Sequence, residues 1–131
     1  MITAVDTSVL LDILLRDPVH EEPSLAALRK GRMEGKLIIC DFVLAEIGPL
    51  TGSQLPLFLS DFAIQFDPTS FEAATIAGKS FASYLKRGSQ RGRIVADFLI
   101  GAHAEIHADR LLTRDEGFQR DYFKKLPIWY P

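Results

Sequence analysis

The sequence has little cysteine, little net charge and no long uninterrupted apolar run. Its single cysteine, Cys40, excludes an internal disulfide framework and fits a reducing cytoplasm. Because Cys40 lies in the apolar run "LIIC", we expect a buried structural thiol rather than a nucleophile. The formal net charge of −2 provides no overall attraction to nucleic acids or membranes, so any such binding requires a local patch.

The first residues also lack the features of a targeting segment. No basic leader precedes their apolar run, and Asp6 and Asp12 interrupt it, so we expect neither a signal peptide nor a membrane span there. The chain shows no internal repeat. With 131 residues, of which 47% are hydrophobic and 24% charged, it has the size of one domain and can bury a sizeable core. We therefore expect a single cytoplasmic domain over residues 1–131.

Short β-rich runs alternate with stretches of helical period along the chain. The expected strands are 2–6, 37–41, 62–67, 109–115 and 126–131. The expected helices are 7–17, 20–36, 42–50, 68–88 and 91–108, with the third ended by Gly48 and Pro49. This alternation favours an α/β fold with a central parallel sheet flanked by helices on both faces.

Four acids stand at informative places in this arrangement. Asp6 ends the first expected strand, and Asp115 comes just past the apolar part of the fourth. Glu46 and Asp97 lie on expected helices among apolar neighbours. Because ligand sites in open α/β sheets form at the carboxyl ends of the strands, these acids could converge there. Carboxylates packed together stay ionised mainly when a cation holds them, and oxygen ligands suit Mg²⁺ and Mn²⁺.

The stretches "VDTSVLLDIL", "LAEI", "VADFLIGAHA" and "LLTRDEGF" follow one another over nearly the whole chain. In this order they resemble the PIN-domain ribonucleases, and most nearly the VapC-type toxins of bacterial toxin–antitoxin pairs. The resemblance implies one small PIN-like α/β domain with a parallel sheet. The metal-binding acids of the family match four residues of this chain: Asp6, Glu46, Asp97 and Asp115. Thr113 matches a supporting hydroxyl, whereas Ala96 stands where the family often has Asn.

The resemblance implies an Mg²⁺- or Mn²⁺-dependent endoribonuclease that cleaves RNA phosphodiester bonds. A metal ion can lower the pKa of a bound water, so no Ser, Cys or His nucleophile is required. We expect Asp6 and Asp97 to bind the metal directly, and Glu46 and Asp115 to bind it directly or through water. One of these last two would accept a proton from the attacking water.

The resemblance also implies protein partners, because VapC-like proteins typically dimerise and bind an antitoxin whose tail enters the acidic groove. We expect a homodimer and a small antitoxin that brings a basic residue to the acids. The helical stretches 7–15 and 24–33 carry more apolar residues than one core face requires, which favours an interface there. The alternative is a monomer with these residues in its core.

Each acid also has a purely structural interpretation. Asp6 could cap the helix that follows it, and Asp97 could serve only a helix N-terminus. Glu46 could be a solvated helix residue. Asp115 competes with its neighbours Glu116 and Asp109 for the fourth place in the site.

Other charged residues have less certain roles. Asp12 is expected to face solvent or to pair with a base such as Arg16, four residues further on. Arg114 could contact a phosphate or pair with the acids. His103 and His107 have a spacing that can bind Zn²⁺ on a helix, but Ala104 stands where the zincin pattern needs Glu. We therefore expect a structural or surface role for this pair, with His103 about one and two-thirds turns beyond Asp97 and so within reach of the acidic site.

The stretch "YLKRGSQRGRI" is the most basic part of the chain. Two interpretations of it stay open, a solvated loop and a flexible arm that grips RNA phosphates beside the acids. Its basic residues are Lys86, Arg87, Arg91 and Arg93.

Other functional classes share some of these features. A phosphohydrolase of the haloacid dehalogenase type begins with a strand-end Asp but needs a second Asp two positions later, where Ser8 stands. A receiver-type signalling domain normally has an acid pair at its first strand, which is missing here. A catalytically silent PIN-type RNA-binding module is the third alternative, and the presence of all four acids argues against it. The sequence identifies neither the RNA nor the cleavage motif.

Overall fold

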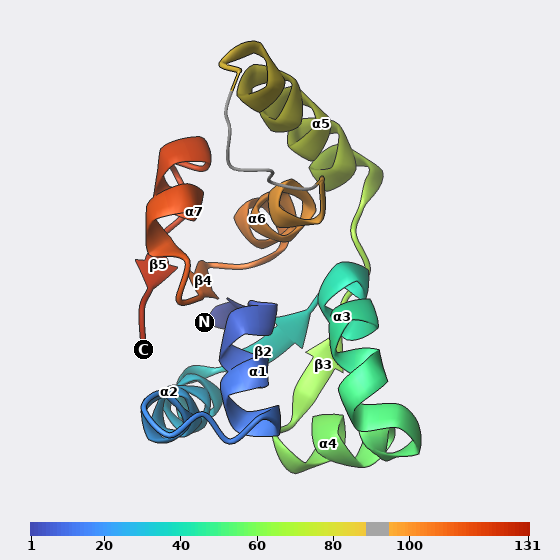
Figure 1. Ribbon diagram of the computed structural model, residues 1–131, viewed down its shortest axis with the longest axis vertical. Coiled ribbons are helices and arrows are strands. Elements are labelled where there is room, and N and C mark those ends of the chain that lie inside the picture. The colour runs from blue at the N-terminus through green and yellow to red at the C-terminus, as the bar shows by residue number, and fades with distance from the viewer. Residues whose placement is uncertain (89–94) are drawn as a thin grey trace.

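Parallel strands form the centre of the computed structural model, which describes residues 1–88 and 95–131 (Figure 1). Within these residues five strands make one sheet in the order β3-β2-β1-β4-β5, and every pairing is parallel. The strands are β1 (Ile2–Val5), β2 (Lys36–Ile39), β3 (Ile64–Phe66), β4 (Arg110–Leu112) and β5 (Ile128–Trp129). The predicted α/β fold with a central parallel sheet is confirmed.

Helices cover both faces of the sheet. They are α1 (Thr7–Leu14), α2 (Glu21–Glu34), α3 (Asp41–Thr51), α4 (Leu55–Asp61), α5 (Phe71–Lys86), α6 (Val95–His107) and α7 (Glu116–Tyr122), with a short 3₁₀ turn η1 (Gly52–Gln54). Figure 1 shows α1 to α4 on one side of the sheet and α5 to α7 on the other. Because crossovers between parallel strands are right-handed, the helices change sides when the chain reverses its direction across the sheet.

That reversal occurs between β1 and β4. The chain builds β1, β2 and β3 outward in one direction, then returns to place β4 on the other side of β1. The two strands end side by side, with Val5 opposite Leu112. The next amide along, Asp6 N–H, donates to the Leu112 carbonyl at 2.9 Å. Ligands of open α/β sheets bind at such a reversal, so the fold puts Asp6 at the most favourable position for a site.

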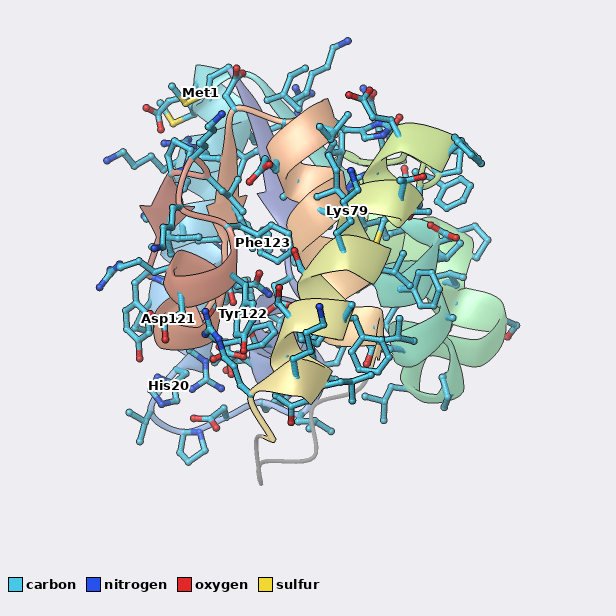
Figure 2. The ribbon with its side chains drawn as sticks, turned by 90° about the horizontal axis from the view of Figure 1, so that it is seen from above. Met1, His20, Lys79, Asp121, Tyr122 and Phe123 are labelled. Carbon is cyan, nitrogen blue, oxygen red and sulfur yellow. The ribbon has the colours of Figure 1, made fainter. Side chains whose placement is uncertain are left out.

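A glycine in α6 makes room for two side chains that come from α7 and from the residue that follows it. A Cβ atom at Gly101 of α6 would lie 2.3 Å from the Phe123 ring and 2.3 Å from Gln119 Oε1, so only glycine fits. Figure 2 shows Tyr122 and Phe123 on the side of α7 that faces α5 and α6. The Tyr122 ring packs edge-on against Phe98 of α6, with 5.3 Å between ring centroids. This contact holds the end of α7 at a fixed place relative to α6.

The structure differs from the sequence-based elements at three places. α4 and α7 were not predicted, because seven residues are too few to show a helical period. Pro49 does not end α3, which continues to Thr51. Pro49 and Ala45, whose carbonyl loses its helical partner, are both exposed, so water replaces that hydrogen bond. Residues 91–94 of the last predicted helix lie outside the described residues.

The segment Asp41–Asp61 is the most apolar exposed part of the fold. Its length and mean hydropathy of 1.3 would suit a membrane span, and only 17% of it is buried. Figure 1 shows α4 turning away from the direction of α3 at η1, and α4 then packs beside β3. The segment is thus built into the domain. It leaves Leu50 and Leu57 48% and 57% exposed.

Candidate functional site

Asp6 is a buried carboxylate at the junction of β1 and β4. Its side chain is only 8% exposed, and it accepts hydrogen bonds from Thr113 Oγ1 at 2.6 Å and from Ser8 Oγ at 3.0 Å. Burial raises the pKa of Asp6 above its usual value, the two hydroxyls oppose this rise, and the charge of Asp115 adds to it. Asp6 occupies the N-cap position of α1 without making a side-chain capping bond. Helix capping therefore does not explain this residue.

Asp115 lies close enough to Asp6 for its charge to act on it, and Thr113 connects the two. The Asp115 backbone N–H donates to Thr113 Oγ1 at 2.9 Å, while that same oxygen donates its proton to Asp6. Asp115 is half-buried at the N-terminal boundary of α7. The hydroxyl predicted to support the site is thus bonded to both strand-end acids.

Glu46 reaches the same region from α3. Its Oε1 atom accepts a hydrogen bond of 2.8 Å from Thr7 Oγ1, and Thr7 directly follows Asp6. Glu46 is exposed, as the solvated interpretation expected, but its carboxylate is anchored next to the end of β1. The bond joins α3 to the start of α1 and keeps the acid at this edge of the sheet.

Asp97 is the third acid in chain order and lies in the first turn of α6, half-buried. Its backbone carbonyl accepts a hydrogen bond of 3.4 Å from Gln119 Nε2 of α7. Gln119 is itself 2% exposed and packed at Gly101. The start of α6 is therefore held against the helix that follows Asp115.

Position excludes one of the two competing acids, Asp109, from this site. Asp109 accepts the Ile2 N–H at 2.6 Å at the opposite, amino end of β1, so it does not belong to this site. Glu116 is the first residue of α7.

Asp12 pairs with a base, as one of the two expectations had it, but it is buried and its partner is Arg114 instead of Arg16. Asp12 is 2% exposed and forms an ion pair with Arg114, with 2.5 Å between Oδ1 and Nη2, while Ser24 Oγ donates to Oδ2 at 2.7 Å. Because α1 packs against α2, this face of α1 points inward, away from the exposed Arg16. Arg114 also donates its backbone N–H to Ser8 Oγ at 3.1 Å, which anchors the chain beside Asp6.

The two histidines of α6 lie apart from the acids. His103 and His107 follow Asp97 by six and ten residues, which is about 9 and 15 Å along a helix axis. His103 is 1% exposed and, with His107, contacts Asp67 at the end of β3. The expected structural role fits this placement.

Part of the predicted basic stretch is visible. Lys86 ends α5, and Arg87 follows it with its guanidinium 5.2 Å from the centre of the Tyr122 ring. Arg91 and Arg93 lie outside the described residues. Arg87 lines a surface hollow of about 410 Å³ together with Arg120, Asp121 and Lys124. No local pattern marks Arg120 and Lys124, because they reach Arg87 through the folding of the chain and not through sequence spacing.

The donors gathered at this edge suit a hard divalent cation. They are carboxylates and hydroxyls, and oxygen is the ligand atom that Mg²⁺ and Mn²⁺ prefer. A buried carboxylate whose neighbour carries the same charge is costly without a positive partner. The arrangement around Asp6 therefore fits such an ion.

The PIN domain family model matches residues 3–124 of the chain. The fold is similar to that of VapBC2 from Rickettsia felis bound to a DNA fragment from its promoter, with 21% identity and a TM-score of 0.76 over 99% of this chain and 98% of the other. It is also similar to FitAcB from Neisseria gonorrhoeae, with 24% identity and a TM-score of 0.66 over 98% and 96% of the two chains. DNA-bound VapBC from Salmonella typhimurium is similar as well, with 15% identity and a TM-score of 0.70 over 99% of this chain and 98% of the other. No curated protein matches the chain in sequence.

Proposed function

The chain belongs to the PIN domain family, whose members are generally nucleases, and we propose that it is a divalent-metal-dependent endoribonuclease acting as the toxin of a toxin–antitoxin pair. The observation that carries the proposal is the buried Asp6 carboxylate facing the charge of Asp115 at the reversal between β1 and β4. Repulsion between two such carboxylates raises the free energy of the protein without a metal ion, and a bound cation turns this into a favourable interaction.

The roles of the four acids follow from their burial and place. Asp6 and Asp97 bind the cation directly, and Glu46 and Asp115 bind it directly or through water. Either Glu46 or Asp115 accepts the proton of the attacking water, and both are more solvated than Asp6. Bound there, Mg²⁺ or Mn²⁺ supplies positive charge at the scissile phosphate and acidifies that water. Thr113 holds Asp6 in place, as its two hydrogen bonds indicate.

RNA is the proposed substrate, and the hollow around Arg87, Arg120 and Lys124 is the proposed contact for its phosphates. Phosphate contacts supply affinity and position the strand without reading its sequence. The hollow adjoins α7, and the residue before that helix is the acid Asp115. A strand lying across α7 would therefore connect the basic hollow to the acidic site.

We also propose a homodimer and an antitoxin partner. The similar VapBC2 and VapBC structures are described as bound to DNA, and both are complexes by name. Exposed apolar side chains available for an interface include Leu50 and Leu57 of α3 and α4, and also Leu15 and Met33 of the stretches 7–15 and 24–33 that the sequence suggested. Val9, Leu10 and Leu28 of α1 and α2 are at most 1% exposed and belong to the core. Light scattering that finds a monomer at tens of micromolar, a range where weak dimers associate, would contradict the dimer.

The direct test is incubation of the purified protein with a pool of structured and unstructured RNAs in Mg²⁺, Mn²⁺ or excess chelator, followed by sequencing of the RNA ends. We expect cleavage with either metal and none in chelator. Asp6→Asn should abolish cleavage, whereas Asp109→Asn, the same change at the amino end of the sheet, should retain it.

Other outcomes point to the alternative functions. Cleavage that persists in chelator rules out the metal mechanism. Release of phosphate from a phosphomonoester without RNA cleavage indicates a phosphohydrolase. RNA binding without cleavage in either metal indicates a silent RNA-binding module.

A further inference from the structure

Asp67, His103 and His107 form a compact cluster that the nuclease function does not use. Asp67 Oδ2 lies 2.9 Å from His103 Nε2 and 2.8 Å from His107 Nδ1. The two imidazole rings stack, with centroids 4.6 Å apart and planes inclined by 16°. Their spacing of four residues puts both rings on one face of α6, and Asp67 meets them from the end of β3.

These three residues offer one ligand atom each, and the ligand atoms all lie within 4.8 Å of one another. Two imidazole nitrogens and one carboxylate oxygen are a donor set that Zn²⁺ and similar transition metals accept at about 2.0–2.2 Å. Small side-chain movements would bring them to that distance from a common ion. A fourth position would remain for water.

A second feature of the cluster is its outer support. The far nitrogen of His107, Nε2, lies 2.9 Å from Ser70 Oγ, which also accepts the Ala73 N–H at the start of α5. In metal sites a ligating imidazole usually donates its other N–H to such an oxygen, which fixes the tautomer and the ring orientation. If Nδ1 of His107 binds the ion, Nε2–H already has its acceptor in place.

The cluster can also be reached from the solvent by a cation. Asp67 and His107 line a surface hollow of about 170 Å³, which gives an ion a path to both side chains. His103 and His107 lie about 9 and 15 Å from Asp97 along α6, which separates the cluster from the acidic site.

We propose that Asp67, His103 and His107 bind a divalent transition metal ion of the Zn²⁺ type, which fastens α6 to the end of β3 and to the start of α5. The ion replaces the shared hydrogen bonds of Asp67 with three metal–ligand bonds. Its role is structural, and it does not depend on the proposed nuclease activity.

The test is a Zn²⁺ titration of the full-length protein in excess Mg²⁺, followed by calorimetry and by thermal melts. His107→Gln and Asp67→Asn each remove a ligand at a partly exposed position, where folding is retained more readily than at the buried His103. His20→Gln is the matched control, because His20 is the one histidine of the sequence outside the cluster and lies at the start of α2. Co²⁺ provides an independent readout through the visible absorption of a tetrahedral site.

We expect one Zn²⁺ per chain in the parent and in His20→Gln, with a rise in melting temperature. Loss of a ligand should weaken binding by more than the about 10–100-fold that loss of an outer-shell partner costs. Equal Zn²⁺ affinity in the parent and His107→Gln would overturn the proposal. The proposal would also fail if the parent bound no Zn²⁺, because the three side chains would then form only a hydrogen-bonded triad. It would fail too if Asp6→Asn lost Zn²⁺ binding, because the ion would then belong to the acidic site.

Discussion

The hydroxyl of Thr113 donates a hydrogen bond of 2.6 Å to Asp6 Oδ2 across 107 positions of sequence. The same oxygen accepts the Asp115 N–H at 2.9 Å, so one buried side chain serves both strand-end acids. Without it, Asp6 would lose its strongest compensating contact against burial. The position of Thr113 at the end of β4, next to β1, makes this arrangement possible.

Replacing Thr113 by Val keeps the shape of the side chain and removes both contacts. We expect a loss of about 1–3 kcal/mol in unfolding free energy, the cost of leaving buried polar groups without partners. RNA cleavage should fall by about 10–100-fold, as for outer-shell changes at other metal sites. Denaturant unfolding and cleavage rates measure the two effects. Thr113→Ser, which retains the hydroxyl, should restore most of both, and an equally inactive Ser variant would contradict this role.

Asp115→Asn removes one of the facing charges with little change in volume. In chelator we expect the variant to melt higher than the parent, with a gain on the order of 1 kcal/mol from relief of functional-site strain. Loss of a negative charge at the start of α7 opposes this gain, but a seven-residue helix has little dipole to lose. Excess Mn²⁺ should stabilise the parent more than the variant. If Mn²⁺ raised the melting temperature of both proteins equally, Asp115 would not be a metal ligand.

The buried ion pair between Asp12 and Arg114 should be sensitive to loss of either member. Arg114→Gln leaves the Asp12 carboxylate, 2% exposed, without its cation, and we expect a loss of about 3–5 kcal/mol. Arg16→Gln, at the exposed position that the sequence suggested as the partner, should change stability by less than about 0.5 kcal/mol. Urea unfolding of the two variants decides between the pairings.

The stability contributed by Asp41 should depend on pH. Burial raises the pKa of Asp41, but hydrogen bonds from the Thr69 hydroxyl at 2.6 Å and amide at 3.0 Å outweigh it and hold the pKa below its usual value. The stability that Asp41 contributes is therefore complete when the pH is above its pKa in the unfolded state. It is lost as the pH falls through its pKa in the native state. Thr69→Val should cost about 1 kcal/mol at neutral pH. Melting curves of both proteins should converge in acid, and a constant difference would exclude Asp41 as the cause.

The basic hollow should contribute to RNA affinity without touching the acids. Arg120→Gln and Lys124→Gln should each weaken RNA binding and lower the slope of log affinity against log salt by about 0.7 per lost phosphate contact. Lys79→Gln, at the exposed position on α5 labelled in Figure 2, is the control and should leave the slope unchanged. If the salt slope were unchanged in all three variants, the hollow would be an ordinary solvated surface that does not contact RNA phosphates.

Sequence patterns were sufficient for the strands, the long helices and the placement of Asp6, because local periodicity and strand-end position carry that information. They were insufficient for contacts between distant segments. Asp12 finds Arg114 at a separation of 102 residues, and no local pattern favours that partner over Arg16. The histidine spacing on α6 is visible in the sequence, whereas their third neighbour, Asp67, is supplied by the packing of α6 against the end of β3.

The strand order has a consequence for how the protein opens. β1 is paired on both sides, whereas in the described part of the sheet β3 and β5 each have one neighbour and only three and two residues. Amide hydrogen exchange should therefore be slowest at the centre, including the Asp6 amide bonded to Leu112, and fastest at the edges. Asp6 thus lies at the end of the strand that should open last, whereas Asp67 of the histidine cluster follows the edge strand β3, where a bound metal ion should slow exchange most.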